Sequence, residues 1–308
     1  MTKAKPFIKW AGGKGQLLSQ LEALLPADFN NWEDVTYVEP FVGGGAMLFH
    51  MLQTHPGITR AIINDINPNL TTCYRVVRER PTELIGCLLD MQARYYACAT
   101  QEERQTMFIE QRNHYNTASL DDVENAALFI FLNRTCFNGL YRVNSKGKFN
   151  VPHGRYLHPL ICDEVTIRAD SELLQRVEIL TGDFEATLTD ACSRMLYYID
   201  PPYRPLNSTS NFTDYAKEAF DDNEQRRLKR FCDKLNDRGA AFMLSNSDCL
   251  ASDCADRFFD DLYADYRIER VTASRNINSN PLKRGKLTEI VVANYEKQTT
   301  PQQLCLAI

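Results

Sequence analysis

The stretch Val35-Thr36-Tyr37-Val38-Glu39-Pro40-Phe41-Val42-Gly43-Gly44-Gly45-Ala46 decides the fold class of this chain. It joins a short apolar run, which predicts a buried strand over 35–39, to a predicted helix over 46–53 through a glycine triplet. Glycines in such a loop permit positive φ and let a ligand approach the backbone, and the following helix N-terminus offers free N–H groups. A second predicted strand, 60–65, ends in Asp65, an acid suited to the diol of a ribose. Together these features predict a cofactor that carries adenosine; Asp65 could also be a plain helix cap, a role that does not exclude ribose binding.

The rest of the chain alternates predicted strands and helices. A helix is predicted at 222–237, and strands are predicted at 177–181, 195–200, 240–245, 267–272 and 289–295. This alternation predicts an α/β fold with a mostly parallel, doubly wound sheet and helices on both faces. From residue 67 to about 137, apolar residues recur every three or four positions, which predicts helices, and a basic loop follows. We therefore expect an inserted domain over 67–175 and a main domain built from 1–66 and 176–308.

Charge is distributed unevenly along the 308 residues. The chain holds 35 Lys and Arg against 40 Asp and Glu, a formal net charge of −5. Segments 1–20, 132–160 and 266–297 together carry +13, which leaves −18 for the remainder. An acidic body with basic segments is compatible with a polyanionic partner, although the net charge alone would argue against one. In the third segment, Lys283-Arg284-Gly285-Lys286 is the candidate for a loop that contacts a nucleic-acid backbone.

Several function classes are excluded by simple patterns. The longest apolar run, 126–132, is too short to span a bilayer, and the N-terminus lacks the apolar core of a signal peptide. We expect a cytoplasmic protein without a membrane partner. The ten cysteines contain no C-x-x-C pair, and no His pair has zinc spacing, so we expect reduced thiols and no metal site. Gly12-Gly13-Lys14 does not complete a phosphate-binding loop, so ATP is not expected.

The motif Asp200-Pro201-Pro202-Tyr203 carries the most specific chemistry. The exocyclic amine of a nucleobase is a poor nucleophile because its lone pair is delocalised into the ring. The Asp200 carboxylate and the Pro201 carbonyl can accept its two N–H bonds and aim the lone pair at an electrophile. Tyr203 can stack on the base, and the two prolines are rigid and offer no competing N–H group. The motif therefore predicts group transfer to a base amine, with Asp200 as a hydrogen-bond acceptor whose pKa is an ordinary one near ~4.

Residues 133–152 alternate polar, aromatic and basic side chains around Ser145-Lys146-Gly147-Lys148. This pattern predicts a β-hairpin with a glycine turn. A basic hairpin can enter the major groove of DNA, where an arginine bonded to both O6 and N7 of guanine discriminates by ~1–3 kcal/mol. The alternative is a basic loop that is merely solvated.

In these motifs the chain resembles the Dam-type DNA adenine N6-methyltransferases of class alpha, the group that reads GATC. The resemblance rests on 9–14, 39–45, 64–67, 132–152, 200–206 and 244–246, in the order that this group shows. It implies a Rossmann-like methyltransferase sheet with an inserted target-recognition domain. It also implies transfer of a methyl group from S-adenosylmethionine to N6 of adenine, in GATC of double-stranded DNA, by base flipping.

The resemblance also assigns residues to roles. Catalysis falls on Asp200, Pro201, Pro202 and Tyr203, and cofactor binding on Trp10, Lys14, Glu39, Phe41, Gly43, Gly45, Asp65 and Asp200. Lys14 would neutralise the methionine carboxylate. DNA binding falls on Lys9, Arg134, Phe137, Asn138, Leu140, Arg142, Asn144, Lys146 and Pro152. Among these, Arg142 would read the guanine, Leu140 and Pro152 would pack on thymine methyls, and Arg134 would hold a phosphate. Phe137 would wedge into the base stack, and Asn138 would contact the space that the flipped base vacates.

Other functions remain open at this stage. Cytosine N4 methylation uses the same amine chemistry, RNA or protein-glutamine methylation uses related motifs, and a non-catalytic DNA-binding regulator could retain the scaffold. Asp200 and the complete set of pocket residues favour adenine methylation. We expect a monomer that associates with DNA in a bacterial or phage-infected cell, either solitary or part of a restriction-modification system.

Overall fold

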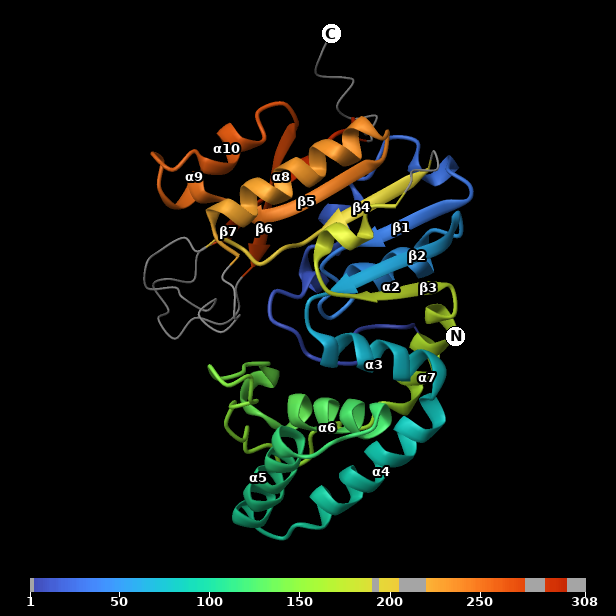
Figure 1. Cartoon of the computed structure of the whole chain (residues 1–308), viewed down its shortest axis with the longest axis vertical. Helices are drawn as coiled ribbons and strands as arrows, with labels where there is room; N and C mark the ends of the chain where they lie inside the picture. Colours follow the sequence, from blue (N-terminus) through green and yellow to red (C-terminus); the bar gives the residue numbers. More distant parts are fainter. Residues whose placement is uncertain (1–2, 190–193, 205–219, 275–285, 298–308) are drawn as a thin grey trace.

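A seven-stranded sheet forms the centre of the molecule (Figure 1). The structure, a computed structural model, describes residues 3–189, 194–204, 220–274 and 286–297. Lys283, Arg284 and Gly285 of the expected DNA-contacting loop lie outside these ranges, as do residues 205–206 of the motif region. The strand order is β3-β2-β1-β4-β5-β7-β6. The strands are β1 Val35–Glu39, β2 Ile58–Asp65, β3 Val177–Thr181, β4 Met195–Ile199, β5 Ala241–Ser247, β6 Arg267–Ser274 and β7 Lys286–Ala293.

Strand direction confirms the mostly parallel sheet. Strands β1 to β5 pair in parallel, whereas β7 runs antiparallel between β5 and β6. Alternate residues of β1 enter two different cores: Tyr37 packs in the cluster that contains Leu48 of α2 (Ala46–Thr54), and Val38 packs with Phe231 of α8 (Asp222–Asp237). Helices therefore cover both faces, as expected for a Rossmann-like α/β fold.

Helix α8 shows how local sequence produces this packing. Asp221 caps it by accepting hydrogen bonds from the N–H groups of Asn223 and Glu224. The buried residues Leu228, Phe231, Cys232 and Leu235 recur at helical spacing and form one apolar face, which packs beside β5 in Figure 1. The remaining short helices of this part are α1 (Leu18–Glu22), α9 (Cys249–Ser252) and α10 (Phe258–Leu262), together with the 3-10 turns η1 (Lys14–Gln16), η2 (Phe29–Asn31) and η4 (Phe184–Thr187).

The segment that interrupts the alternation is helical, as predicted. It contains α3 (Pro68–Glu79), α4 (Pro81–Ala97), α5 (Gln101–Thr117), α6 (Asp122–Thr135), the 3-10 turn η3 (Phe137–Gly139) and α7 (Glu164–Leu174). Figure 1 places α4, α5 and α6 away from the sheet, with α3 between them and the sheet. Residues 126–133 of α6 are all buried, so α6 is the centre of this helical part.

Helix α3 is attached to the sheet as well as to the helices. The hydroxyls of Thr71 and Thr181 are 2.7 Å apart, and Arg78 Nη1 donates to the carbonyl of Val177 at 2.7 Å. The predicted domain boundary at residue 67 would therefore place α3 in the inserted domain, although α3 is hydrogen-bonded to the edge strand β3 of the main sheet. The division into two domains stays a prediction.

The chain forms the predicted reversal around a glycine turn. Asn144 N–H donates to the Lys148 carbonyl at 2.9 Å, and Gly147 has a φ of 73°. Phe137 N–H donates to the Pro152 carbonyl at 2.9 Å, and Asn150 N–H donates to the Arg142 carbonyl at 3.1 Å. The arms also form two isolated bridges, Cys136 with His153 and Val143 with Phe149. They therefore pair at intervals, and neither arm forms a continuous strand.

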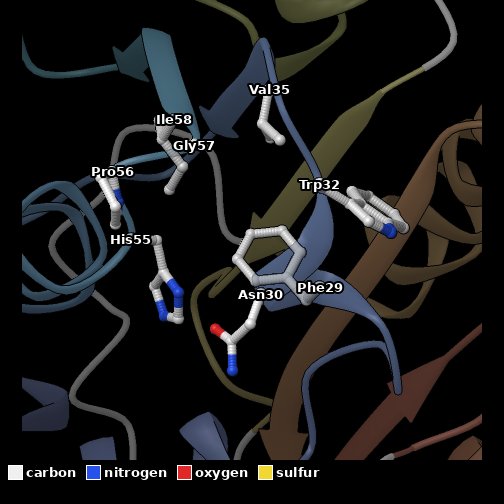
Figure 2. Close-up of a pocket in the computed structure, with 8 residues that line it drawn as sticks. All are labelled: Phe29, Asn30, Trp32, Val35, His55, Pro56, Gly57 and Ile58. Carbon is white, nitrogen blue, oxygen red and sulfur yellow. The ribbon is translucent and has the colours of Figure 1, made fainter.

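A small cavity lies at the opposite end of the sheet from the glycine loop (Figure 2). Its volume is about 30 Å³, and its lining includes Val35 and Ile58, the first residues of β1 and β2, beside the rings of Phe29 and His55. A space of this size holds about one water molecule. It is too small and too distant along the strands to belong to the site described next. Within the described ranges, no helix combines the length and apolar character that a bilayer crossing requires.

Candidate active site

The carboxyl ends of β1, β2 and β4 meet at one edge of the sheet because these strands are parallel. Glu39 is the last residue of β1, Asp65 is the last of β2, and Asp200 directly follows β4. This edge is where open α/β sheets bind ligands. The tertiary structure thus brings together the glycine loop, the acid of the second strand and the D-P-P-Y motif.

The glycine loop has a shape that side chains would obstruct. Gly43 has a φ of 48°, and a Cβ there would lie 2.9 Å from Trp10 Cδ1. Gly45 has a φ of 73°, and a Cβ there would lie 2.5 Å from the Tyr74 hydroxyl. Glycine is required at both positions for backbone conformation and for space.

Asp65 holds the glycine loop against the start of α3. Its Oδ2 accepts the N–H of Gly43 at 3.1 Å, and its Oδ1 accepts the N–H of Asn67 at 2.9 Å. Burial raises the pKa of Asp65 to about 6, opposed by these backbone hydrogen bonds. The cap of α3 is Asn67, whose side chain accepts from Asn69 N–H, so the reading of Asp65 as a helix cap is wrong.

Lys14 is the buried centre of the site, with a relative exposure of 5%. Its Nζ donates to the Tyr203 hydroxyl at 2.6 Å, lies 3.1 Å from Asp200 Oδ1 and 3.4 Å from Glu289 Oε2, and sits 4.3 Å from the Tyr203 ring centroid. The Tyr203 hydroxyl in turn donates to Glu289 Oε2 at 2.7 Å. One cation therefore joins two carboxylates and a tyrosine.

Sequence reasoning missed Glu289. This residue lies near the amino end of β7, opposite Ser247 of β5. Because β7 is antiparallel to its neighbour, its amino end reaches the edge where the parallel strands terminate. A search for acids at carboxyl ends of strands passes over it, and a carboxylate next to the apolar run 290–293 is the one signal that could have drawn attention to it.

Besides Asp65, two further carboxyl groups of the site have raised pKa values. Burial raises the pKa of Asp200 to about 6; the Lys14 charge opposes this rise and the Glu289 charge adds to it. The expectation of an ordinary value near ~4 is therefore wrong, because the sequence does not reveal how far packing removes water from this carboxyl. Glu39 is 2% exposed and accepts the Tyr37 hydroxyl at 2.6 Å, and burial raises its pKa to about 8. It lies beneath the loop as a largely neutral group at pH 7.

The two aromatic candidates for the pocket lie on different sides of it. Phe41 packs 5.3 Å from the Phe184 ring, beside η4. Trp10 contacts the glycine loop and stacks on Tyr141, with ring centroids 5.7 Å apart. Trp10 thus links the loop at the cofactor edge to the segment expected to read DNA.

Hydrogen bonds also join the N-terminal segment to the end of α6 and the turn that follows it. Lys9 N–H donates to Asn133 Oδ1 at 2.8 Å, and Asn133 Nδ2 donates to the carbonyls of Lys9 and Gly139, each at 2.8 Å. The exposed Lys9 ammonium lies 5.3 Å from the Tyr156 ring centroid. Lys9 therefore belongs to the same surface as the turn that follows α6.

The structure exposes some of the expected DNA contacts and buries others. Arg142 Nε donates to Asn150 Oδ1 at 2.7 Å, and Leu140 is half-buried against the core. Arg134 is half-buried, donates to the Phe7 carbonyl at 2.7 Å and has a pKa lowered by burial, so this arrangement does not support a phosphate contact. Asn144 is half-buried in the turn, and the exposed members of the set are Lys9, Phe137, Asn138, Lys146 and Pro152.

Metal and disulfide chemistry receive no positive signal. In the described part of the chain, no three His, Cys, Asp or Glu side chains gather as metal ligands would. The cysteines of the described ranges are free thiols: Cys73, Cys87, Cys98, Cys136, Cys162, Cys232, Cys249 and Cys254.

Comparison with known proteins gives a consistent result. The family model described as "D12 class N6 adenine-specific DNA methyltransferase" matches residues 10–277. The type II methyltransferase M.MjaIII of Methanocaldococcus jannaschii is 44% identical over 296 residues, which cover 95% of this chain and 100% of that protein. The type II methyltransferase M1.LlaDCHI of Lactococcus lactis subsp. cremoris is 38% identical, with 94% and 95% covered. The DNA adenine methylase of Escherichia coli strain K12 is 31% identical, again with 94% and 95% covered.

Proposed function

The chain belongs to the D12 class of N6 adenine-specific DNA methyltransferases, and from this premise we propose that it methylates the adenine of GATC in duplex DNA, with S-adenosylmethionine as donor and the target base flipped out. Membership makes it an enzyme that methylates DNA adenine. The observation that carries the catalytic part of this proposal is the meeting of Asp200, Tyr203 and Lys14 beside the glycine loop. The GATC sequence is proposed from the resemblance of residues 132–152.

The residues at the strand ends fit this donor. Each oxygen of Asp65 accepts one backbone N–H and keeps acceptor capacity for the hydroxyls of a ribose. Gly43 and Gly45 let the loop pack closely against Trp10 and Tyr74. The adjacent Ile66 exposes 74% of its surface as a platform for an adenine ring. When bound, S-adenosylmethionine supplies an activated methyl group.

Lys14 has a different role from the one that resemblance assigns to it. Its ammonium already pairs with Asp200 and Glu289 and donates to Tyr203. Neutralising a methionine carboxylate would require it to leave one of these partners. We propose instead that Lys14 balances the charge of the two acids and fixes Tyr203.

Asp200 and Pro201 act on the target amine. With a pKa of about 6, Asp200 is mostly ionised at neutral pH and accepts one N–H of adenine N6, while the Pro201 carbonyl accepts the other. The nitrogen lone pair is then directed away from the ring and toward the methyl group. Formation of the N–C bond would be matched by cleavage of the bond between the methyl group and sulfur, with S-adenosylhomocysteine as the leaving group. The nitrogen must then lose one proton, and Asp200 accepts it more readily than a carboxylate with an ordinary pKa would.

DNA binding would use the surface that follows α6. Phe137 is 51% exposed next to Asn138, and Lys9 and Lys146 supply exposed positive charge. Asp200 keeps only 22% of its side-chain surface exposed, so an adenine inside a duplex could not reach it. Extruding the base costs a few kcal/mol and solves this problem of access.

The test is methyl transfer to two duplexes that differ only in the guanine of one GATC site. We expect N6-methyladenine in the GATC duplex, detected by mass spectrometry of the nucleosides and by resistance to a methylation-sensitive GATC nuclease. Transfer to both duplexes at equal rates would contradict the GATC assignment and leave the family activity intact. Absence of transfer to any duplex would contradict the proposed function as a whole.

The alternative functions that the sequence left open can now be weighed. The adenine-specific family excludes cytosine N4 methylation and the RNA and protein substrates. The complete Lys14, Asp65 and Asp200 set argues against a non-catalytic regulator. The monomeric state, the cytoplasmic location and a place in a restriction-modification system stay predictions.

A further inference from the structure

We propose that Glu289 is a positioning residue of the active site, which holds the Tyr203 ring through its hydroxyl and draws Lys14 away from Asp200. The inference rests on the proposed role of Asp200 and Tyr203 in holding the target adenine. It is independent of whether the enzyme reads GATC.

The carboxylate of Glu289 is held in a fixed place. Its backbone lies in β7, where it pairs with Ser247 of β5 on one side and Val271 of β6 on the other. Its side chain is 15% exposed, and Oε2 receives the Tyr203 hydroxyl at 2.7 Å and faces Lys14 Nζ at 3.4 Å. A strand paired on both sides cannot shift without breaking its ladder, so this carboxylate is a rigid reference point.

The neighbouring acid has different partners. Thr288 donates to Asp248 Oδ2 at 2.8 Å, and Arg270 Nε donates to the same oxygen at 3.2 Å. The Arg270 guanidinium therefore pairs with Asp248, whereas Glu289 contacts Lys14 and Tyr203. Glu289 of β7 and Asp248, which directly follows β5, therefore belong to different clusters.

The effect on Tyr203 follows from the hydroxyl. A stacking residue must present its ring at one angle, and the hydroxyl bonds to Glu289 and Lys14 restrain that ring at its far end. Loss of the Glu289 acceptor leaves Lys14 as the partner of the hydroxyl. A less restrained ring would hold the adenine less accurately beside the methyl donor, and misplacement of reacting groups slows transfer strongly.

The effect on Asp200 follows from the shared cation. Lys14 Nζ lies almost midway between Asp200 and Glu289, at 3.1 and 3.4 Å. The ionisable groups that act on Asp200 are Lys14, Glu289 and Tyr203, with Glu39 and Tyr198 behind them. Without the Glu289 charge, Lys14 would pair with Asp200 alone and compete with the target amine for the same carboxylate.

The test compares Glu289→Gln with Glu269→Gln, a matched control on the adjacent strand β6. Gln keeps an acceptor for Tyr203 and removes the charge. Glu269 pairs with Lys297 at 2.8 Å and lies 3.8 Å from Arg267, and within the described ranges neither of these partners belongs to the site. We expect kcat of Glu289→Gln to fall at least 10-fold, while KM for DNA stays within 2-fold of the wild-type value. We also expect the acid limb of the plot of kcat against pH to move to lower pH, because the Glu289 charge raises the pKa of Asp200. The control should stay within 2-fold of the wild type.

A double-mutant cycle with Tyr203→Phe separates positioning from a general structural effect. If Glu289 acts partly through the hydroxyl, Glu289→Ala should cost clearly less in the Tyr203→Phe background than in the wild type. Strict additivity of the two losses would overturn the coupling to Tyr203. An unshifted acid limb together with unchanged kcat in Glu289→Gln would overturn the coupling to Asp200.

A structural measurement keeps the inference testable apart from turnover. Crystal structures of wild type and Glu289→Gln at one pH should show Lys14 closer to Asp200 in the variant. An unmoved Lys14 and Tyr203 would overturn the inference whatever the activity. If the wild type itself transfers no methyl group to DNA, the proposed function fails, which is a separate outcome from an active wild type with an unaffected variant.

Discussion

Replacing Lys14 by Met removes the cation that two acids share. Met has a similar length and no charge, so the change isolates electrostatics from packing. In the variant, Asp200 and Glu289 would face each other without the ammonium that lies 3.1 and 3.4 Å from them. Breaking a buried ion pair from one side costs ~3–5 kcal/mol. Because the two acids keep 22% and 15% exposure, we reduce this to ~2–3 kcal/mol for solvent screening.

The pH dependence of this loss has a definite sign. Lys14 lowers the pKa of Asp200, so its removal raises that pKa further above the unfolded value of ~4. An acid whose folded pKa is raised loses stability as the pH increases from the unfolded value through the folded one. The gap between wild type and Lys14→Met should therefore be largest at pH 8 and smaller at pH 5, where Asp200 is mostly protonated.

Thermal unfolding monitored by circular dichroism at pH 5 and pH 8 provides the assay. At ~2 °C per kcal/mol for a chain of this size, we expect Tm to fall by ~4–6 °C at pH 8 and by about half of that at pH 5. Lys3→Met, which changes an exposed lysine, serves as the control and should leave Tm within ~1 °C. A loss of equal size at both pH values would refute the shared-cation reasoning, even if the variant is inactive.

Three further predictions concern other parts of the molecule. Asp170 is fully buried with one oxygen unpaired, and burial raises its pKa to about 8, far above the unfolded value of ~4. Asp170→Asn should therefore be nearly neutral for stability at about pH 4, gain on the wild type by ~1.4 kcal/mol per pH unit as the pH rises toward 8, and show no further gain above pH 8, measured by urea unfolding. Asp65→Ala should weaken S-adenosylmethionine binding at least 10-fold in calorimetry, and unchanged affinity would remove Asp65 from the pocket. Arg142→Ala should relax discrimination at the guanine of GATC by ~1–3 kcal/mol in kcat/KM, and an unchanged preference between the two duplexes would remove it from base reading.

Local sequence patterns predicted the fold closely. The helix over Asp222–Asp237 was placed at its observed bounds, because an acidic cap and a 3–4 residue apolar repeat are both local signals. The strands β1 to β5 were found within two residues at each end for the same reason. The basic turn at 145–148 was located correctly, and the Asn144 side chain stabilises it by accepting the N–H groups of Lys146 and Lys148.

The candidate site was predicted in composition and only partly in geometry. Lys14, Asp65, Asp200 and Tyr203 were identified, and the structure brings Lys14, Asp200 and Tyr203 into direct contact. The partners of Lys14 could not be predicted from the sequence. Tyr203 follows Lys14 by 189 positions, and Glu289 follows it by 275. Pairings at that separation leave no periodic signal.

The sequence by itself determined which chemical groups stand at the ends of the parallel strands. Strand, glycine loop and helix follow one another within a dozen residues, and both the conformational freedom of glycine and the rigidity of Asp200-Pro201-Pro202-Tyr203 are local properties. Only the tertiary structure decided that Glu289 joins them, because the antiparallel strand β7 brings its amino end to their edge. It also decided that Asp200 is a stronger base than a solvated carboxylate, since its pKa of about 6 depends on the water that packing removes.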